Sequence, residues 1–352
     1  MNILINGFGR IGRILARQIF KKKNLHLVHV NDIIKDVNNI IYLLKYDSTY
    51  GNIGTDLRLN GKVIQSSSDK FIYSSETDIE KIKFQKKIDV LIDSSGDEKN
   101  IISARKLIKK KLIKYYIFTM TSNLVDREIV FGLNDNQIDN DKVISSSICD
   151  SNAISHFLNF INQENEIING SVTTLHPWLS YQNLLDGAAK GIGPDPNKYT
   201  PKLNSNSHLN GNLALGRSSV SALIPKKTTA VSVCEKLIPE LKNKIISHSF
   251  RVPTSVVSCA DIVLNLSKND DEIVNKIFKW TKKKKFLDIS NEYCTSKDFE
   301  GNEHSAILDE NWIYKKDKLL KLVLWYDNEW GYSARVLDLA QKLINEKKNF
   351  NR

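Results

Sequence analysis

The start of the chain places the strongest constraint on its fold. A glycine-rich segment, Gly7-Phe8-Gly9-Arg10-Ile11-Gly12, follows an apolar run at residues 2–6 and leads into residues with helical spacing. A second apolar run covers residues 25–30 and ends just before Asp32, about 20 residues beyond the last glycine. A GxGxxG segment alone is weak evidence, but this order of strand, glycines, helix, strand and acidic residue predicts a dinucleotide-binding unit.

Each glycine has a separate task in such a unit. Gly7 permits the tight turn, Gly9 lets a pyrophosphate approach the backbone, and Gly12 allows close packing of helix against strand. The amino-terminal end of the helix then faces the phosphates. A carboxylate at Asp32 would accept hydrogen bonds from the adenosine ribose and would repel a 2′-phosphate, so the sequence favours NAD over NADP. The alternative is a glycine turn that binds no ligand.

The same alternation of strand and helix continues to about residue 150. Residues 88–93 and 115–119 have the pattern of buried strands, and residues 99–112 between them have the pattern of a helix. Such alternation predicts an α/β fold with a Rossmann, doubly wound parallel sheet. The dinucleotide should lie across the carboxyl ends of its strands.

The second part of the chain has longer, alternating strand patterns. They cover residues 168–175, 245–252, 256–266 and 319–326. This predicts an α+β domain whose mostly antiparallel sheet has helices on one face.

We therefore expect two domains. The first is an NAD-binding domain at residues 1–148, completed by a terminal helix at 334–352, and the second is a catalytic domain at 149–333. The second contains a Gly/Pro/Asn-rich loop at 188–215, which is long for a compact domain and is therefore either functional or mobile.

A cysteine and a histidine in the second part form a candidate catalytic pair. Cys149 precedes an apolar helical pattern, and a helix N-terminus favours a thiolate. His176 ends the β-rich run 172–176, so its ring can be held rigidly. If the fold brings the two together, His176 can take the thiol proton and the sulfur can attack a carbonyl carbon. The alternative is an inert core cysteine and a structural histidine.

Composition limits the remaining classes. The four cysteines are widely spaced with no CxxC pair, so we expect neither a disulfide framework nor a zinc site. The net charge of +11 comes largely from scattered lysine runs without interleaved aromatic residues, which we interpret as solvated helix ends and not as a nucleic-acid surface. No long apolar run or cationic leader is present. We expect no membrane span, no signal peptide and a cytoplasmic protein.

Six ordered segments of the chain resemble a single family. They are Ile5-Asn6-Gly7-Phe8-Gly9-Arg10-Ile11-Gly12-Arg13, Lys45-Tyr46-Asp47-Ser48-Thr49-Tyr50-Gly51, Cys149 with Asn152, residues 172–176, Phe250-Arg251-Val252-Pro253-Thr254 and Trp325-Tyr326-Asp327-Asn328-Glu329-Trp330-Gly331-Tyr332-Ser333. Together they resemble glyceraldehyde-3-phosphate dehydrogenase, and the resemblance runs from Asn2 to the terminal helix.

The resemblance implies a mechanism and an assembly. Cys149 would attack an aldehyde to give a thiohemiacetal, and His176 would remove the hydroxyl proton. Oxidation with NAD as acceptor would leave a thioester on Cys149, which phosphate or water would cleave. The Cys149 amide and the His176 side chain would stabilise the oxyanion. Members of the family are usually homotetramers.

The resemblance also implies binding residues. Those for the cofactor are Gly7, Phe8, Gly9, Arg10, Ile11, Gly12, Asp32, Thr119, Asn328 and Tyr332. Those for the substrate or phosphate are Arg251, Thr228, Thr229 and Arg217. A guanidinium fork such as that of Arg251 suits a pair of phosphate oxygens. No metal is implied.

The sequence departs from the family pattern beside the cysteine. The family usually has Ser-Cys-Thr-Thr-Asn, whereas this chain has Ile148-Cys149-Asp150-Ser151-Asn152. A carboxylate at Asp150 would disfavour bound phosphate and raise the thiol pKa. Alternatively, Asp150 is an ordinary acidic first-turn residue that points at solvent.

Further departures lie downstream. Leu179 stands where a small polar residue is usual, and Tyr181 stands where an acidic or small polar residue is usual. The segment Lys226-Lys227-Thr228-Thr229 replaces a common Ser-Ser-Thr-Gly, so a glycine near the expected phosphate is lost while two positive charges are gained. The loop at 188–215 makes this region about twenty residues longer than the family pattern.

Our preferred hypothesis is an NAD-dependent oxidoreductase that acts on the aldehyde of a (phospho)sugar, with altered anion sites. Release of the thioester by water then becomes plausible, as in the erythrose-4-phosphate dehydrogenase relatives. The alternative is the ordinary phosphorylating glyceraldehyde-3-phosphate dehydrogenase of glycolysis, because Arg251, Arg217 and Thr228 still offer anion contacts. A third hypothesis is a non-catalytic NAD-binding protein with a polyanion partner.

Overall fold

The structure is a computed structural model, and it describes residues 1–66, 69–189 and 213–350, with side chains to residue 345. The chain divides into two compact units. The first consists of Met1–Ile148 and Ser333–Arg352, and the second consists of Cys149–Tyr332. Residues 190–212 of the predicted long loop lie outside the described residues.

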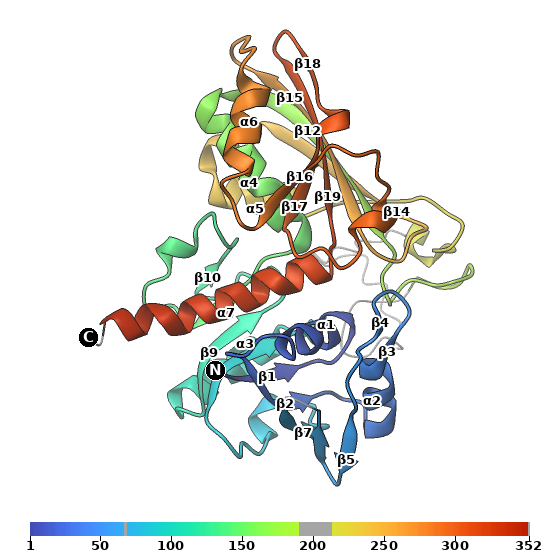
Figure 1. Ribbon diagram of the computed structural model, residues 1–352, viewed down its shortest axis with the longest axis vertical. Coiled ribbons are helices and arrows are strands. Elements are labelled where there is room, and N and C mark those ends of the chain that lie inside the picture. The colour runs from blue at the N-terminus through green and yellow to red at the C-terminus, as the bar shows by residue number, and fades with distance from the viewer. Residues whose placement is uncertain (67–68, 190–212, 351–352) are drawn as a thin grey trace. The chain divides into compact units, whose positions relative to one another are not determined.

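The described part of the first unit is built on a nine-stranded sheet in the order β10-β11-β9-β8-β1-β2-β7-β6-β5 (Figure 1). The strands from β10 to β7 run parallel, and β6 and β5 extend one edge in antiparallel pairing. The strands are β1 (Asn2–Asn6), β2 (His26–Asn31), β5 (Arg58–Asn60), β6 (Val63–Gln65), β7 (Lys70–Ser74), β8 (Ile88–Asp93), β9 (Ile113–Phe118), β10 (Arg127–Glu128) and β11 (Val143–Ser145), with β3 (Tyr46–Asp47) and β4 (Gly51–Asn52) forming a separate pair.

Helices connect these strands. Helix α1 packs against β1 and β2, and α3 packs against β9 and β11. The side chain of Asp36 caps α2 by accepting a hydrogen bond from the Asn38 amide, which satisfies one of the free N–H groups at the helix start. The helices are α1 (Arg10–Ile19), α2 (Val37–Lys45), α3 (Lys99–Lys109) and α7 (Trp330–Phe350), with the 3-10 turns η1 (Ile79–Lys81) and η2 (Asp135–Gln137).

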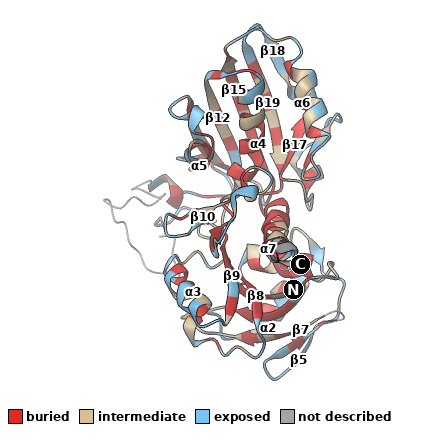
Figure 2. Cartoon of the chain, turned by 90° about the vertical axis from the view of Figure 1, so that its left-hand side faces the viewer, coloured by how far each residue is buried: buried red, intermediate tan, exposed pale blue. Residues whose placement is uncertain are grey.

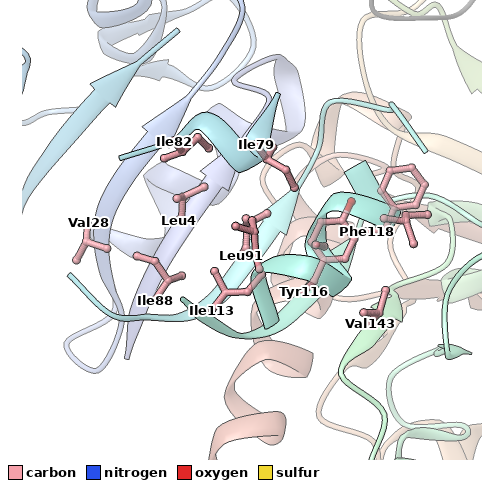
Figure 3. Close-up of a cluster of buried hydrophobic side chains, with 13 residues drawn as sticks. Leu4, Val28, Ile79, Ile82, Ile88, Leu91, Ile113, Tyr116, Phe118 and Val143 are labelled. Carbon is pink, nitrogen blue, oxygen red and sulfur yellow. The ribbon is translucent and has the colours of Figure 1, made fainter. Parts of the chain in front are cut away.

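The core of the first unit shows why the sheet is covered on both faces. Leu4, Leu91 and Tyr116 belong to one buried cluster, shown in Figure 3, that also contains side chains of α3. Ile3 and Val90 are fully buried as well, although adjacent residues of a strand point to opposite faces. A parallel sheet that is apolar on both faces must carry a layer on each. The predicted doubly wound α/β sheet is therefore confirmed.

The described part of the second unit contains an eight-stranded sheet in the order β13-β14-β12-β15-β19-β17-β16, with β18 paired to β19. The pairs β12–β14 and β16–β17 are parallel and the others are antiparallel, so the prediction of a mostly antiparallel sheet is confirmed. The strands are β12 (Ile167–Pro177), β13 (Ile224–Lys226), β14 (Ile245–Val252), β15 (Ser258–Leu266), β16 (Leu287–Ser290), β17 (Ala306–Asp309), β18 (Tyr314–Lys316) and β19 (Leu319–Tyr326).

One face of this sheet carries the helices. Helix α4 packs against β12, β17 and β19, and it also contacts α5 and α6. In β19, Leu320, Leu322, Leu324 and Tyr326 are buried while the residues between them are less so, and Figure 2 shows buried residues concentrated along α4 and the strands beneath it. The helices are α4 (Cys149–Glu164), α5 (Ala230–Leu237) and α6 (Ile273–Thr281), with the 3-10 turns η3 (Leu213–Gly216), η4 (Pro239–Leu241), η5 (Ser296–Phe299) and η6 (Glu310–Trp312).

None of the described helices is both long and apolar enough to cross a membrane. All four cysteines lie within the described residues and are free thiols.

Candidate active site

The second unit brings the predicted cysteine and histidine together. Cys149 is the first residue of α4, and His176 lies near the carboxyl end of β12. The Cys149 Sγ and the His176 Nε2 are 3.7 Å apart, which is within hydrogen-bond range for sulfur. The His176 ring is buried, with 6% of its surface exposed. The alternative of an isolated core cysteine is therefore wrong.

A backbone carbonyl fixes which nitrogen of His176 carries the proton. The Nδ1 atom lies 2.8 Å from the carbonyl oxygen of Pro177. A carbonyl oxygen can only accept, so Nδ1–H is the donor and the lone pair of Nε2 faces the thiol. The ring is thus oriented to receive a proton from Cys149 or from a group bound to it.

Asp150 lies close to Cys149 and His176, and we call these three residues the thiol cluster. Its carboxylate is buried, and its Oδ1 lies 3.4 Å from the Cys149 Sγ. The Tyr326 hydroxyl donates to the same Oδ1 over 2.9 Å, and the Thr228 hydroxyl donates to Oδ2 over 3.4 Å. Asp150 therefore does not point at solvent. Of the two interpretations drawn from the sequence, the one that places its carboxylate beside the thiol is the one that the structure shows.

Burial and charge set the protonation of the pair. The pKa of the Cys149 thiol is raised well above its ordinary value, first by burial and then by the charge of Asp150. The pKa of His176 is lowered to about 3, first by burial and then by the nearby Arg251 guanidinium. The thiolate that we expected at the helix N-terminus is therefore not the favoured form, because burial and Asp150 outweigh the helix dipole.

Two cations share the buried face of the sheet with His176. Arg251 pairs with His176 across β12 and β14, and Lys226 pairs with Ser249, two residues before Arg251. Alternation along a strand puts Ser249 and Arg251 on the same face, and Lys226 with them. Arg251 is 5% exposed, and its Nε has no hydrogen-bond partner among the described residues. The pKa of Lys226 is lowered to about 8 by burial and by Arg251.

The other predicted anion contacts lie in different surroundings. Thr228 is part of the cluster through Asp150, and it also accepts a hydrogen bond from the Ala230 amide over 3.1 Å. Thr229 is the residue just before α5 and its side chain does not cap the helix. Arg217 is exposed and forms an ion pair of 2.6 Å with Asp186. The structure thus places Thr228 against Asp150, whereas the Arg217 side chain pairs with Asp186.

In the first unit, the predicted cofactor residues gather at one edge of the sheet. Gly7, Asp32 and Thr119 follow β1, β2 and β9, whose parallel strands all end at this edge. The Gly7 amide donates to the Asn31 carbonyl over 2.8 Å, and the Thr119 amide donates to the Asp93 carbonyl over 3.0 Å. This edge is where parallel sheets of this kind bind a dinucleotide.

The glycines of this edge fit a pyrophosphate. A Cβ atom at Gly7 would lie 2.4 Å from the Ser95 amide nitrogen, and Gly7 has a φ of +82°, which favours glycine. A Cβ at Gly12 would lie 2.2 Å from the Gly7 carbonyl oxygen. A Cβ at Gly9 would meet no atom within 4 Å, so Gly9 leaves open space at the start of α1. This is the arrangement that a phosphate needs to approach the backbone.

The other predicted cofactor residues have defined places. Asp32 accepts hydrogen bonds from the Phe8 and Ile34 amides, and its carboxylate is partly exposed at this edge. The Phe8 side chain is buried in the core and the Arg10 side chain binds Asp47, so these two residues offer a ligand their backbone. Ile11 is half-buried.

Asn328 and Tyr332 belong to the second unit and are both buried. The Oδ1 atom of Asn328 has no hydrogen-bond partner among the described residues, so it is free to accept one from a ligand amide.

A parallel dinucleotide-binding sheet in one unit and a thiol–imidazole pair in the other define a two-domain, NAD-dependent dehydrogenase with a cysteine nucleophile. Residues 1–101 match the family model "Glyceraldehyde 3-phosphate dehydrogenase, NAD binding domain". Residues 197–328 match "Glyceraldehyde 3-phosphate dehydrogenase, C-terminal domain". The chain belongs to the glyceraldehyde-3-phosphate dehydrogenase family and is an enzyme with the Cys149–His176 pair.

Full-length relatives support the same assignment. Glyceraldehyde-3-phosphate dehydrogenase 1 of Kluyveromyces marxianus is 33% identical over 347 residues, which cover 97% of this chain and 99% of the relative. Glyceraldehyde-3-phosphate dehydrogenase B of Aspergillus oryzae is 33% identical and covers 96% of each chain. Glyceraldehyde-3-phosphate dehydrogenase 3 of Saccharomyces cerevisiae is 32% identical and covers 97% of this chain and 98% of its own.

Sequence reasoning did not assign a role to Tyr326 or place Lys226 among the binding residues. Burial, and then the charge of Asp150, raises the pKa of Tyr326 well above its ordinary value, so the hydroxyl stays a donor to that carboxylate. The alternation in β19 was the available signal, since Tyr326 follows Leu320, Leu322 and Leu324 on the buried face. Only the pairing of β13 with β14 places Lys226 on the face of Arg251.

Proposed function

We propose that this enzyme oxidises the aldehyde group of a sugar phosphate with NAD⁺ as acceptor, and that water releases the acyl group from Cys149. The observation that carries the proposal is the buried Asp150 carboxylate, 3.4 Å from the Cys149 Sγ and held by Tyr326 and Thr228. We assign cofactor binding to the first unit and catalysis to the second.

The first steps follow from the orientation of the thiol and the imidazole. The Cys149 Sγ attacks the aldehyde carbon, and the thiol proton passes by way of His176 Nε2 or Asp150 Oδ1 to the aldehyde oxygen, which becomes the hydroxyl of a thiohemiacetal. His176 Nε2 then accepts the hydroxyl proton as the carbon is oxidised to the thioester. NAD⁺, when bound, supplies the hydride acceptor. The pKa of His176, about 3, keeps its ring neutral in the free enzyme, so the Nε2 lone pair is not already protonated.

Asp150 favours water as the acyl acceptor. An inorganic phosphate that approached the Cys149 thioester would meet a carboxylate of the same charge, with its Thr228 hydroxyl partner already engaged. Water meets no such repulsion, and a carboxylate oxygen can accept its proton as the C–O bond forms. The thiol leaves as the C–S bond breaks, which regenerates Cys149.

Arg251 and Lys226 support an anionic substrate. Both lie on the buried face beside His176, and the Arg251 Nε has no partner among the described residues. A buried guanidinium with an unused donor is suited to a phosphate group. We propose that these two residues bind the remote phosphate of the aldehyde, while the Thr228 hydroxyl stays on Asp150. We also propose Thr229 and Arg217 as anion contacts, and the ion pair of Arg217 with Asp186 would have to open for Arg217 to bind an anion.

We propose the cofactor contacts that the family resemblance implies for these residues. In the first unit these are the backbone of residues 7–12, the ribose contact of Asp32, and Thr119 near the nicotinamide ribose. In the second unit, Asn328 would hold the carboxamide and Tyr332 would pack nearby.

A second candidate is the phosphorylating glyceraldehyde-3-phosphate dehydrogenase reaction. The relatives described above are named glyceraldehyde-3-phosphate dehydrogenase, and they match this chain over nearly its whole length. Arg251 and Thr228 are also suited to anions. The non-catalytic alternative is set aside, because the chain is an enzyme of this family with its thiol and imidazole assembled.

The test measures NADH formation from glyceraldehyde 3-phosphate and from erythrose 4-phosphate, with and without inorganic phosphate, and with Cys149→Ser as the blank. We expect turnover of at least one aldehyde at a rate that does not depend on phosphate. We also expect Asp150→Thr to make the rate rise with phosphate. Strictly phosphate-dependent turnover by the wild-type enzyme would establish the second candidate.

We further propose a cytoplasmic homotetramer, as is usual in this family. The free thiols suit a reducing compartment. The outer face of the second sheet supports assembly, because Ile246 is 75% exposed and Leu175 is 39% exposed on adjacent strands.

A further inference from the structure

We propose that Cys149, Asp150 and His176 also form an inhibitory binding site for a divalent metal ion that prefers sulfur and nitrogen ligands, such as Zn²⁺. Bound there, the ion would occupy the nucleophilic sulfur and stop the enzyme until it is removed. This inference goes beyond the redox function and does not depend on which aldehyde or acyl acceptor the enzyme uses.

Two of the three ligand separations already match those of a tetrahedral site. One sulfur, one carboxylate oxygen and one ring nitrogen lie within 4.8 Å of one another. The Sγ–Nε2 distance is 3.7 Å and the Sγ–Oδ1 distance is 3.4 Å. Zinc bonds of about 2.3 Å to sulfur and about 2.0 Å to nitrogen or oxygen, at a tetrahedral angle, place those atoms about 3.5 Å apart. Binding thus needs little movement of the Cys149 sulfur relative to each of the other two ligand atoms.

Outer partners orient each ligand toward the shared space. The Pro177 carbonyl accepts from His176 Nδ1 over 2.8 Å, which leaves Nε2 available to a metal. The Tyr326 and Thr228 hydroxyls hold the two oxygens of Asp150. Such outer hydrogen bonds are a regular feature of metal sites, where they fix the tautomer and the orientation of the ligands. Three protein ligands leave a fourth position for water.

Some charges around the thiol cluster favour a bound cation and others oppose it. A Cys149 thiolate and the Asp150 carboxylate together match the charge of a divalent ion. Arg251 and Lys226 lie on the same buried face and oppose it, so we expect reversible inhibition and not a permanent structural metal. On binding, the Sγ–H bond is replaced by a metal–sulfur bond and one proton leaves to solvent, with no change of oxidation state.

The test uses Co²⁺ as a spectroscopic probe on the full-length, reduced protein without substrate or NAD⁺. A bond from thiolate to Co²⁺ gives an intense near-ultraviolet charge-transfer band. We expect one equivalent of Co²⁺ to produce this band, Zn²⁺ to remove it by competition, and one proton to be released per Zn²⁺. Wild-type protein that has been alkylated at Cys149 should show no band.

Variants then identify the ligands. Asp150→Asn and His176→Asn should bind Co²⁺ more weakly by more than the roughly 100-fold that loss of an outer-shell partner costs. Cys294→Ser is the matched control, because Cys294 is a partly exposed free thiol like Cys149 but is not one of the three proposed ligands. The Cys294→Ser variant should bind Co²⁺ as the wild type does. A band that survives alkylation of Cys149, or unchanged binding by Asp150→Asn, would overturn the proposal.

Activity gives a separate readout. Zn²⁺ should inhibit NADH formation, and a chelator should restore it in full. Because Co²⁺ binding is measured without turnover, an enzyme that turns over aldehyde but shows no band contradicts only the metal site. A protein that shows the band but no turnover contradicts only the proposed function.

Discussion

The reactivity of Cys149 depends on neighbours that act in opposite directions. The start of α4 favours a thiolate, whereas burial and the charge of Asp150 raise the thiol pKa. His176 is placed to accept a proton, but Arg251 and burial keep its pKa at about 3. The result is a neutral thiol beside a neutral imidazole, so the thiol must lose its proton as the substrate arrives.

The first residue-scale prediction concerns Asp150. Asp150→Asn removes the negative charge beside the sulfur and should lower the pKa of Cys149. A fall of one pKa unit raises the ratio of thiolate to thiol tenfold. We expect inactivation by iodoacetamide near pH 7 to become at least about tenfold faster. Asp186→Asn, which changes an exposed carboxylate, is the control. Equal rates for wild type and Asp150→Asn would show that the carboxylate does not govern the thiol.

The second residue-scale prediction concerns the pH dependence of the free energy of unfolding, to which His176 contributes. Its pKa is about 3 in the folded protein, against 6.5 for an ordinary histidine, so below pH 6.5 the unfolded chain binds a proton that the folded chain refuses. The free energy of unfolding should fall by about 1.4 kcal/mol per pH unit from this group as the pH drops from about 6.5 to 3. Urea unfolding of His176→Asn at pH 7, 6, 5 and 4 should show a shallower fall.

Two comparisons complete that experiment. His29 is also buried, and its pKa of about 4 contributes in the same direction in the first unit, so a part of the fall must remain in His176→Asn. His26→Asn changes an exposed histidine and serves as the control. The same slope in His176→Asn and wild type would contradict the prediction.

At the scale of elements, local pattern predicted most boundaries well. The predicted apolar runs have the same first and last residues as four strands of the structure, β1, β8, β14 and β19. In these strands the ends of the apolar pattern are also the ends of the strand. The run predicted to start at residue 256 begins instead at Ser258 in β15. Val257 has a φ of +70°, a left-handed conformation that a strand cannot contain. Valine favours strands, so nothing in the local sequence signals this turn.

The element-scale prediction compares two glycines of the α1 start. Gly12→Ala should lower the free energy of unfolding by about 1–3 kcal/mol, because its Cβ would lie 2.2 Å from a backbone oxygen that cannot move aside. Gly9→Ala should cost less than about 1 kcal/mol, since nothing lies within 4 Å of its Cβ. It should instead weaken NAD⁺ binding at least about tenfold.

Thermal unfolding without NAD⁺ and calorimetric titration with NAD⁺ separate the two effects. If Gly9→Ala binds NAD⁺ as the wild type does, then the phosphates do not use the open space at the start of α1, and the cofactor contacts proposed for residues 7–12 would have to be revised.

At the scale of the whole molecule, the outer face of the second sheet is partly exposed among the described residues. The outer face of β12 and β14 carries Leu175, Ile246 and Phe250, while helices cover the opposite face. Exposed aliphatic side chains on a sheet face of this kind favour contact with another protein surface. The proposed homotetramer would bury at least part of this face.

The whole-molecule prediction follows from that surface. Ile246→Glu should shift the assembly to smaller species in sedimentation velocity, because a carboxylate would be buried without a partner. The variant should keep its secondary structure, since Ile246 is 75% exposed among the described residues. Tyr293→Glu, at a residue that is 86% exposed, is the control. A wild-type protein that sediments as a monomer would refute the assembly itself.

The sequence was sufficient to predict the nucleotide-binding half, because its signals are local: one strand, three glycines, one helix and one acidic residue within about 30 positions. It also determined the identity of the nucleophile and its base, through ordered motifs. Only the tertiary structure decided the environment of Asp150. Its partners Thr228 and Tyr326 are 78 and 176 residues away in sequence. Contacts between such distant residues arise from strand pairing and burial, which no local pattern records.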